Sequence, residues 1–196
     1  MKSLYQRLDF FSNFHLSDDT IIIFSVGELN KNKNHELVIN ALSKIQDKKI
    51  HYFIAGRGAL ESYLINLSKK LNISENVHLL GFRNDVSDLY KVADMYIHPS
   101  FREGLSVAVM EAMCSGLPMI CSRIRGNTDL IENENGGFLV SPSSVDDMVE
   151  SIATICNMSE KDRKKFGEKN KVIMKNFSIE QVMIETKNIY QLDVNK

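Results

Sequence analysis

Six short apolar runs alternate with amphipathic stretches along this chain, and that alternation constrains the fold more than any other feature. The runs have the length and composition of buried strands, and the stretches between them carry helical periodicity. Strands and helices that alternate at this spacing form a parallel sheet covered by helices on both faces. The predicted strands are residues 20–27, 49–55, 77–80, 94–98, 118–121 and 137–140, and the predicted helices are residues 35–45, 59–71, 85–92, from about 105 onward, 143–156, 159–176 and 178–192.

These elements also predict the domain organisation. A six-stranded sheet of this kind is Rossmann-like and doubly wound, and we expect it in residues 20–158. Residues 1–19 are predicted to form an N-terminal helical or linker segment, and residues 159–196 to form C-terminal helices that pack on the domain. A chain of 196 residues is long enough for one such domain with a sizeable core.

Composition and charge argue against several classes of protein. With 24 basic and 25 acidic residues, the net charge is −1, so no overall field favours nucleic acid. No apolar run approaches the roughly 20 residues that span a bilayer, and the N-terminus lacks a signal-peptide pattern. Three cysteines without C-x-x-C spacing predict free thiols and a cytoplasmic protein, and five scattered histidines give no support for a metal site.

Glycine recurs where the predicted strands end. Gly27 ends the first strand, Gly56 and Gly58 follow the second, Gly81 follows the third, and residues 99–104 follow the fourth. The carboxyl ends of parallel strands share one edge of the sheet, and ligands of doubly wound sheets bind there. The agreement of four loops predicts a ligand site along this edge.

The segment after the fourth strand carries two carboxylates, Glu103 before the next helix and Glu111 within it. Free backbone N–H groups at a helix start attract anions, above all phosphate. A carboxylate does not bind an anion, but it accepts hydrogen bonds from hydroxyl groups. The combination suggests a sugar attached to a phosphate. The structural alternative is that an acidic residue near a helix start is simply stabilised by the helix dipole.

Two further loops offer groups for such a ligand. Gly27 would let the backbone approach a phosphate and Lys33 would supply a positive charge, although a solvated lysine-rich loop fits the pattern equally well. The segment is neither a G-x-G-x-x-G fingerprint nor a P-loop. Arg57 lies in a glycine-flanked segment, which a tight turn before a helix explains as well as ligand binding does.

The remaining candidates have strong structural alternatives. Gly81, Phe82 and Arg83 could frame a flat nucleotide base, although a phenylalanine after a strand is more often a core residue. We interpret His98, at the end of the fourth strand, as a core histidine with satisfied hydrogen bonds. We interpret the basic run 161–175 as a solvated helix face, with a membrane-surface role as the alternative.

Several of these features, with others, follow one another in a distinctive order. They are Gly27-x-Leu29 with Lys33, Ala55-Gly56-Arg57-Gly58, Val77-His78-Leu79-Leu80-Gly81-Phe82, Ala93-Asp94, Pro99-Ser100, Glu103-Gly104-Leu105, Glu111-Ala112-Met113, Gly116-Leu117-Pro118, Arg125-Gly126-Asn127 and Asn135-Gly136-Gly137-Phe138-Leu139-Val140. In this order they resemble the C-terminal half of a family-4 retaining glycosyltransferase with the GT-B fold. The resemblance covers roughly residues 20–156, and its Glu-x7-Glu element is specific to that superfamily.

The resemblance implies a nucleotide-sugar donor site and a role for each of three charged residues. Lys33 would bind the diphosphate, and Glu111 would bind the ribose hydroxyls. Glu103, the candidate catalytic residue, would contact the hydroxyls of the donor sugar. Spreading the charge of the leaving diphosphate would be the main catalytic task.

The same resemblance implies contacts by backbone and aromatic groups. Gly104, Leu105 and Ser106 would offer amides at the helix start, whereas Gly81, Phe82 and Arg83 would border the base. The family transfers sugars with retention of anomeric configuration, and its fold needs no metal or other cofactor. The most similar type builds O-antigen and capsule polysaccharides, which implies a UDP-sugar donor, a lipid-linked or glycan acceptor, and a parent enzyme at the inner face of the membrane.

Two departures qualify this interpretation. Glu28 stands where the family usually has an arginine, which lowers the positive charge near the diphosphate, and Arg57 could compensate. A complete enzyme also has an acceptor-binding N-terminal domain, and nineteen residues before the first strand cannot supply it. We therefore expect an isolated donor-binding domain that transfers little alone. The alternatives are a non-catalytic nucleotide-sugar-binding or partner module and a nucleotide-sugar epimerase domain.

Overall fold

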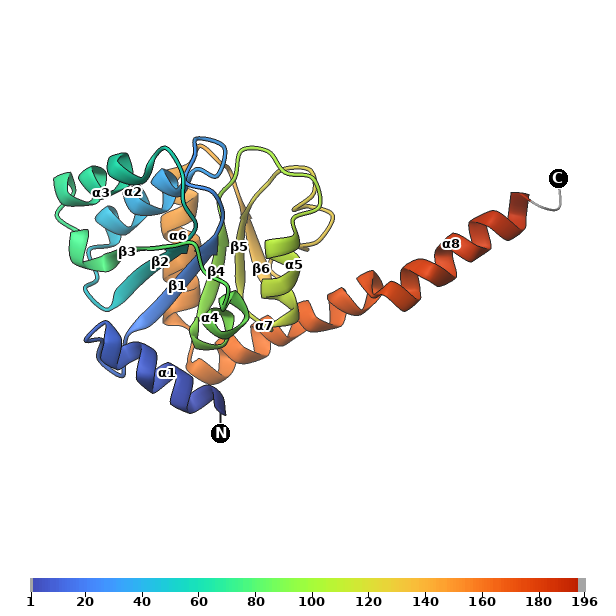
Figure 1. Cartoon of the computed structure of the whole chain (residues 1–196), viewed down its shortest axis with the longest axis horizontal. Helices are drawn as coiled ribbons and strands as arrows, with labels where there is room; N and C mark the ends of the chain where they lie inside the picture. The colour runs from blue at the N-terminus through green and yellow to red at the C-terminus, as the bar shows by residue number, and fades with distance from the viewer. Residues whose placement is uncertain (1, 194–196) are drawn as a thin grey trace.

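The computed structural model describes residues 2–193, and its centre is a six-stranded sheet in the order β3-β2-β1-β4-β5-β6 (Figure 1). All neighbouring strands in it are parallel. The predicted Rossmann-like, doubly wound sheet is therefore confirmed. The strands are β1 Ile21–Val26, β2 Ile50–Ala55, β3 Val77–Gly81, β4 Met95–His98, β5 Met119–Ser122 and β6 Gly137–Val140.

Helices cover both faces of this sheet. One buried cluster joins α2, α3 and α6 to one face, and a second joins α1, α4, α5 and α7 to the other. Two 3₁₀ turns, Ser74–Asn76 and Lys175–Phe177, complete the described elements. The α-helices are α1 Lys2–Asn13, α2 His35–Ile45, α3 Glu61–Lys70, α4 Val86–Val92, α5 Val107–Cys114, α6 Val145–Asn157, α7 Glu160–Met174 and α8 Ile179–Asp193.

The strands are where apolar character predicted them because the sheet is buried on both sides. Ile23, Tyr52, Met95 and Ile120 have no exposed surface, although they come from four different strands. Strands covered on both faces carry near-continuous apolar runs rather than alternating ones. Burial of these side chains is the main force that holds the sheet together.

The strand order creates a crevice between β1 and β4. From β1 the chain proceeds outward to β2 and β3, and from β4 it proceeds outward in the opposite direction to β5 and β6. The loops after β1 and β4 therefore diverge toward opposite faces of the sheet. Such a topological switch point is where open α/β sheets bind ligands.

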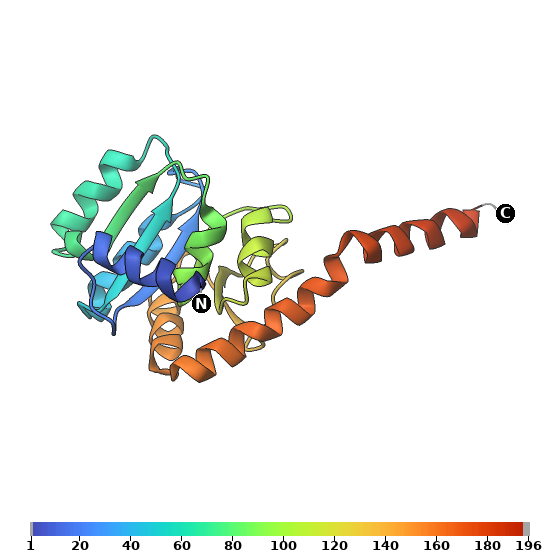
Figure 2. The same ribbon diagram turned by 60° about the horizontal axis from the view of Figure 1, so that its bottom comes forward.

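The helices at the two ends of the chain differ in how they pack on the domain. Helix α1 packs beside α4, and Arg7 in it bonds the carboxylate of Asp94 at 3.0 Å. Helix α7 packs against α5, but α8 projects away from the domain, where we expected it to pack (Figures 1 and 2). Ser178, between η2 and α8, has extended backbone, which redirects the chain. Residue 1 and residues 194–196 of the predicted terminal segments lie outside the described residues.

No helix within residues 2–193 is both long enough and apolar enough to cross a membrane.

Candidate functional site

Two loops meet across the switch point, one after β1 and the other after β4. Phe101 donates its backbone N–H to the carbonyl of Asn32 at 2.8 Å, and the Asn32 side chain donates to the carbonyl of Arg102 at 2.9 Å. Asn34, in the left-handed conformation before α2, donates its side-chain amide to the carbonyl of Pro99 at 3.1 Å. These bonds fix the two loops relative to each other.

A polar cluster of Lys33, His98 and Glu103 lies where these loops meet. The Lys33 ammonium donates to Glu103 Oε1 at 2.6 Å, and His98 Nε2 is 3.2 Å from the same oxygen. Their side chains are 22%, 2% and 15% exposed, so the cluster is largely shielded from solvent. The bond from His98, together with those from Lys33 and Ser100, lowers the pKa of Glu103 to about 2. Glu103 is therefore a carboxylate at neutral pH.

The glycines of this edge serve close contacts between backbones. A Cβ on Gly56 would lie 1.9 Å from the Gly27 carbonyl oxygen, and a Cβ on Gly58 would lie 2.5 Å from that of Leu29. Gly27 itself leaves room for the Lys33 side chain, which a Cβ would meet at 3.2 Å. The β2 loop therefore supports the β1 loop from behind, and Gly27 in turn supports the lysine.

A third loop supports Glu103 from the other side. Gly126 has φ +90°, and a Cβ there would lie 2.0 Å from the carbonyl oxygen of Gly104. Only glycine allows this approach in this backbone conformation. Gly126 thus holds the Glu103–Gly104 segment in place.

The start of α5 presents its first residues to solvent. The helix begins at Val107, close to the predicted start, and Ser106 precedes it without a side-chain cap. Gly104 is exposed and Leu105 is 52% exposed, whereas Ser106 is buried. Gly104 and Leu105 thus lie at an accessible edge just before the helix start, where free backbone N–H groups attract anions.

The two carboxylates of the Glu-x7-Glu element have different surroundings. Glu111 lies on the exposed surface of α5, where its Oε2 accepts a bond of 3.2 Å from the Tyr90 hydroxyl. Glu103 belongs to the polar cluster, and the contacts of the two residues are not shared. Glu103 therefore lies in the loop before α5 and Glu111 lies within the helix, and the two carboxylates have different bonding partners.

The loop after β3 carries an exposed aromatic ring. Phe82 is 71% exposed, so it is not the core residue that its position after a strand favoured. Gly81 has φ +66°, and Arg57 is exposed near it. Arg83 donates to Asp85 through Nε at 2.8 Å, so this guanidinium is already paired.

Glu28 is also exposed at this edge, and its carboxylate accepts a bond of 3.0 Å from the Asn30 amide. It therefore adds an acidic side chain to the same loop as Lys33. Within residues 2–193 no group of three or more histidine, cysteine or acidic side chains is placed to hold a metal ion.

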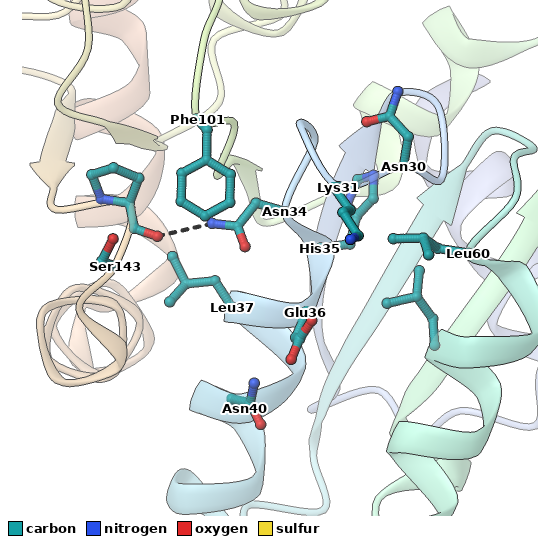
Figure 3. Close-up of a pocket in the computed structure, with 12 residues that line it drawn as sticks. Asn30, Lys31, Asn34, His35, Glu36, Leu37, Asn40, Leu60, Phe101 and Ser143 are labelled. Atoms are coloured by element: carbon teal, nitrogen blue, oxygen red, sulfur yellow. Dashed lines mark hydrogen bonds between the residues drawn. The ribbon is translucent and has the colours of Figure 1, made fainter.

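A separate hollow, the side hollow, borders the β1–α2 loop and the first turns of α2 (Figure 3). It has a volume of about 410 Å³, and the first turn of α2 lies between Phe101 and Ser143 on one side and Leu60 on the other. Lys33, Glu103 and Glu111 do not line it. Its charged side chains are Lys31 and Glu36, one of each sign.

Sequence reasoning missed one feature of the site. His98 is a buried histidine with hydrogen-bond partners, as expected, but the partners are Ser100 at 3.3 Å and Glu103. A histidine that ends a strand at the carboxyl edge, five residues before the candidate acid, was the available signal.

Comparison with known proteins gives one family match. The family described as glycosyl transferases group 1 matches residues 7–172. A UDP-Gal:alpha-D-GlcNAc-diphosphoundecaprenol alpha-1,3-galactosyltransferase of Escherichia coli is 29% identical over 92% of this chain and 48% of its own. An N-acetylgalactosamine-N,N'-diacetylbacillosaminyl-diphospho-undecaprenol 4-alpha-N-acetylgalactosaminyltransferase of Campylobacter jejuni is 31% identical over 83% of this chain and 44% of its own. The chain thus spans about half the length of the curated relatives it matches.

Solved structures show the same fold. Anabaena Alr3699/HepE, crystallised with UDP and glucose, superimposes with a TM-score of 0.82 at 20% identity, over 96% of this chain and 52% of that one. At this identity the match establishes the fold of the described domain and leaves the ligand open.

Proposed function

This chain belongs to the glycosyl transferases group 1, and we propose that it is the nucleotide-sugar-binding half of a retaining enzyme of that family. The observation that carries the proposal is the polar cluster at the switch point. A cation and a carboxylate lie together there, beside the backbone of residues 104–106, which precede α5. A diphosphate needs the cation and the amides, and a sugar needs the carboxylate.

Each group of the edge has a part in this proposal. Lys33 binds the diphosphate and stabilises the charge that grows on it as the leaving group departs. Glu103 stays in place as Lys33 turns to the diphosphate, and it accepts bonds from sugar hydroxyls, while the amides of Gly104, Leu105 and Ser106 contact the diphosphate. Transfer then needs no metal, because cation and amides carry the charge.

The nucleoside occupies the rest of the edge in the same proposal. Glu111 accepts bonds from the ribose hydroxyls on the exposed side of α5. Phe82 offers a flat apolar surface to the base, bordered by Gly81 and Arg83. Arg57, exposed near Gly81, supplies a second positive charge toward the diphosphate and offsets the unfavourable Glu28.

The names of the relatives support a substrate class. The Escherichia coli relative uses UDP-Gal, and it and the Campylobacter jejuni relative act on diphosphoundecaprenol-linked acceptors. We therefore propose a UDP-hexose or UDP-N-acetylhexosamine donor and a lipid-linked or glycan acceptor in surface polysaccharide synthesis. The three free cysteines support a location in the reducing cytoplasm, at the inner face of the membrane where such acceptors are held.

Transfer further requires an acceptor-binding domain, on the same polypeptide or on a partner. Two observations support this. The curated relatives are about twice as long as the match, and α8 exposes Ile179, Val182 and Ile189 to solvent. We therefore propose that the 196 residues alone bind the donor and transfer little.

Titration calorimetry with UDP-glucose, UDP-galactose, UDP-N-acetylglucosamine and UDP tests this proposal. We expect saturable 1:1 binding of UDP and of at least one UDP-sugar, and weaker binding by Glu111→Ala. Absence of saturable binding for the whole panel would overturn the donor role. Unchanged affinity in Glu111→Ala would remove the ribose contact only.

A further inference from the structure

His98 combines deep burial with a contact to the edge of the sheet. It is the last residue of β4, a central strand, and it is 2% exposed. Its Nε2 is 3.2 Å from Glu103 Oε1 and 3.3 Å from the Ser100 hydroxyl. Since an ionised carboxylate can only accept hydrogen bonds, Nε2 is the donor in the bond to Glu103.

Two of the partners of Glu103, His98 and Lys33, differ in their freedom to move. The His98 ring is stacked near Tyr96, at 6.2 Å between centroids, and its backbone is paired with Cys121 of β5. Lys33 reaches Glu103 from a loop through a flexible four-carbon chain. Both bond the same oxygen, Oε1. A diphosphate that attracts Lys33 would therefore take one partner of Glu103 and leave the other in place.

We propose that His98 is a positioning residue that holds Glu103 by its Oε1 when the diphosphate of a bound nucleotide-sugar draws Lys33 away. Glu103 then keeps the orientation in which Oε2 meets the sugar hydroxyls. The proposal rests on the donor role of the site. Under this proposal, recognition of the sugar, but not of the nucleotide, depends on His98 and Glu103 together rather than on the Glu103 carboxylate alone.

The test compares the affinities for UDP and for the UDP-sugar that binds the wild-type chain most tightly. The variants are His98→Leu, which removes the donor; His98→Gln, whose amide nitrogen takes the place of Nε2; and His98→Asn, whose shorter amide does not reach Glu103. His78→Leu is the matched control, because that half-buried histidine of β3 bonds His51 of β2, away from the cluster.

We expect His98→Leu and His98→Asn to weaken UDP-sugar binding about tenfold, the loss typical of one hydrogen bond to a charged group, while UDP affinity stays within about twofold. His98→Gln should recover most of the loss, and His78→Leu should leave the ratio of the two affinities unchanged. If His98→Leu fails to fold, the test is the difference in UDP-sugar affinity between His98→Gln and His98→Asn.

Three results would overturn the proposal, and they are distinguishable. Equal losses of UDP and UDP-sugar affinity would mean that His98 only maintains the fold. Equal behaviour of His98→Gln and His98→Asn would mean that the hydrogen bond to Glu103 has no role. Absence of binding by the wild-type chain would remove the donor site itself, and the proposal with it.

Discussion

The polar cluster and the side hollow both border the loop after β1, and each has only some of the properties of a binding site. The side hollow has the concave shape and about 410 Å³ of space, but its two charged side chains, Lys31 and Glu36, are of opposite sign. The cluster of Lys33, His98 and Glu103 has the charges and the hydrogen bonds, but its side chains are largely shielded from solvent and do not line the hollow.

The concave shape therefore indicates the side hollow, whereas the charges and hydrogen bonds indicate the polar cluster. We take the charges and hydrogen bonds as the better indicator of the ligand site. Enclosed pockets are the usual sites of small ligands. Under the proposed function a second domain would supply the other wall of the donor site, so this half of it does not have to be an enclosed pocket. The ion pairs of the cluster need no such wall, since they are formed within this chain.

Replacing Lys33 of the cluster and Lys31 of the side hollow should give the largest contrast in UDP affinity. Lys33→Ala should weaken UDP binding about 10- to 100-fold, since it removes a charged hydrogen bond to the diphosphate. Lys31→Ala, on the side hollow, should change it less than about twofold. Calorimetry with UDP measures both, and a larger effect of Lys31 would reverse our assignment of the two regions.

Gly126→Ala tests whether the cluster depends on its supporting loop. A Cβ 2.0 Å from the Gly104 carbonyl at positive φ should destabilise the fold by about 1–3 kcal/mol and weaken UDP-sugar binding about tenfold. For stability the control is Gly104→Ala, since a Cβ at that position meets no atom within 4 Å. Thermal unfolding of both variants is the measurement, and equal melting temperatures would contradict the supporting role.

Exposed aromatic rings allow a similar contrast of moderate size. Phe82→Ala should weaken UDP binding about fivefold or more, because stacking on a base contributes roughly 1–3 kcal/mol. Phe101, 43% exposed, lines the side hollow, and Phe101→Ala should have the smaller effect. If the two variants bound UDP equally well, the base would not lie on Phe82.

The pH dependence of stability tests the ion pairs of the cluster. The pKa of Glu103 is lowered from 4.5 to about 2 in the folded protein, so its bonds stabilise the fold fully above about pH 4.5 and are lost as the pH falls toward 2. The difference in melting temperature between wild type and Glu103→Gln should be constant from pH 8 to 5 and shrink at pH 3. A difference that grows on acidification would contradict the paired state.

Filling the side hollow should have the smallest effect of all. Ser143 is exposed on its wall, and Ser143→Phe should occupy the space without touching the cluster. We expect UDP and UDP-sugar affinities within about twofold of wild type. A loss of more than tenfold, in a variant that melts normally, would show that the ligand occupies the hollow.

Sequence patterns predicted the sheet well because its strands are buried on both faces and their apolar runs are local. The glycines at the carboxyl edge were also visible, but their function was not. Gly56 and Gly126 meet carbonyls of residues far along the chain, and no local pattern encodes such contacts. The same limit applies to His98, whose burial was expected but whose partner depends on how the next loop turns back.

The direction of a side chain at a strand end is equally hard to predict. Phe82 follows β3 at the edge of the sheet and faces solvent, whereas its apolar character favoured the core. The edge position of β3 explains the difference, because fewer elements are available to cover it. The C-terminal helices were predicted to pack on this domain, but the extended backbone at Ser178 directs α8 away from it.

The central claim is that the carboxyl edge around the cluster, and not the side hollow, binds a nucleotide-sugar. Amide chemical-shift mapping of the ¹⁵N-labelled chain during titration with a UDP-sugar tests it most directly. We predict that the largest shifts fall on Gly27, Phe82, Gly104 and Ser106. Largest shifts on Glu36, Asn40 and Ser143, with the cluster unchanged, would contradict the account.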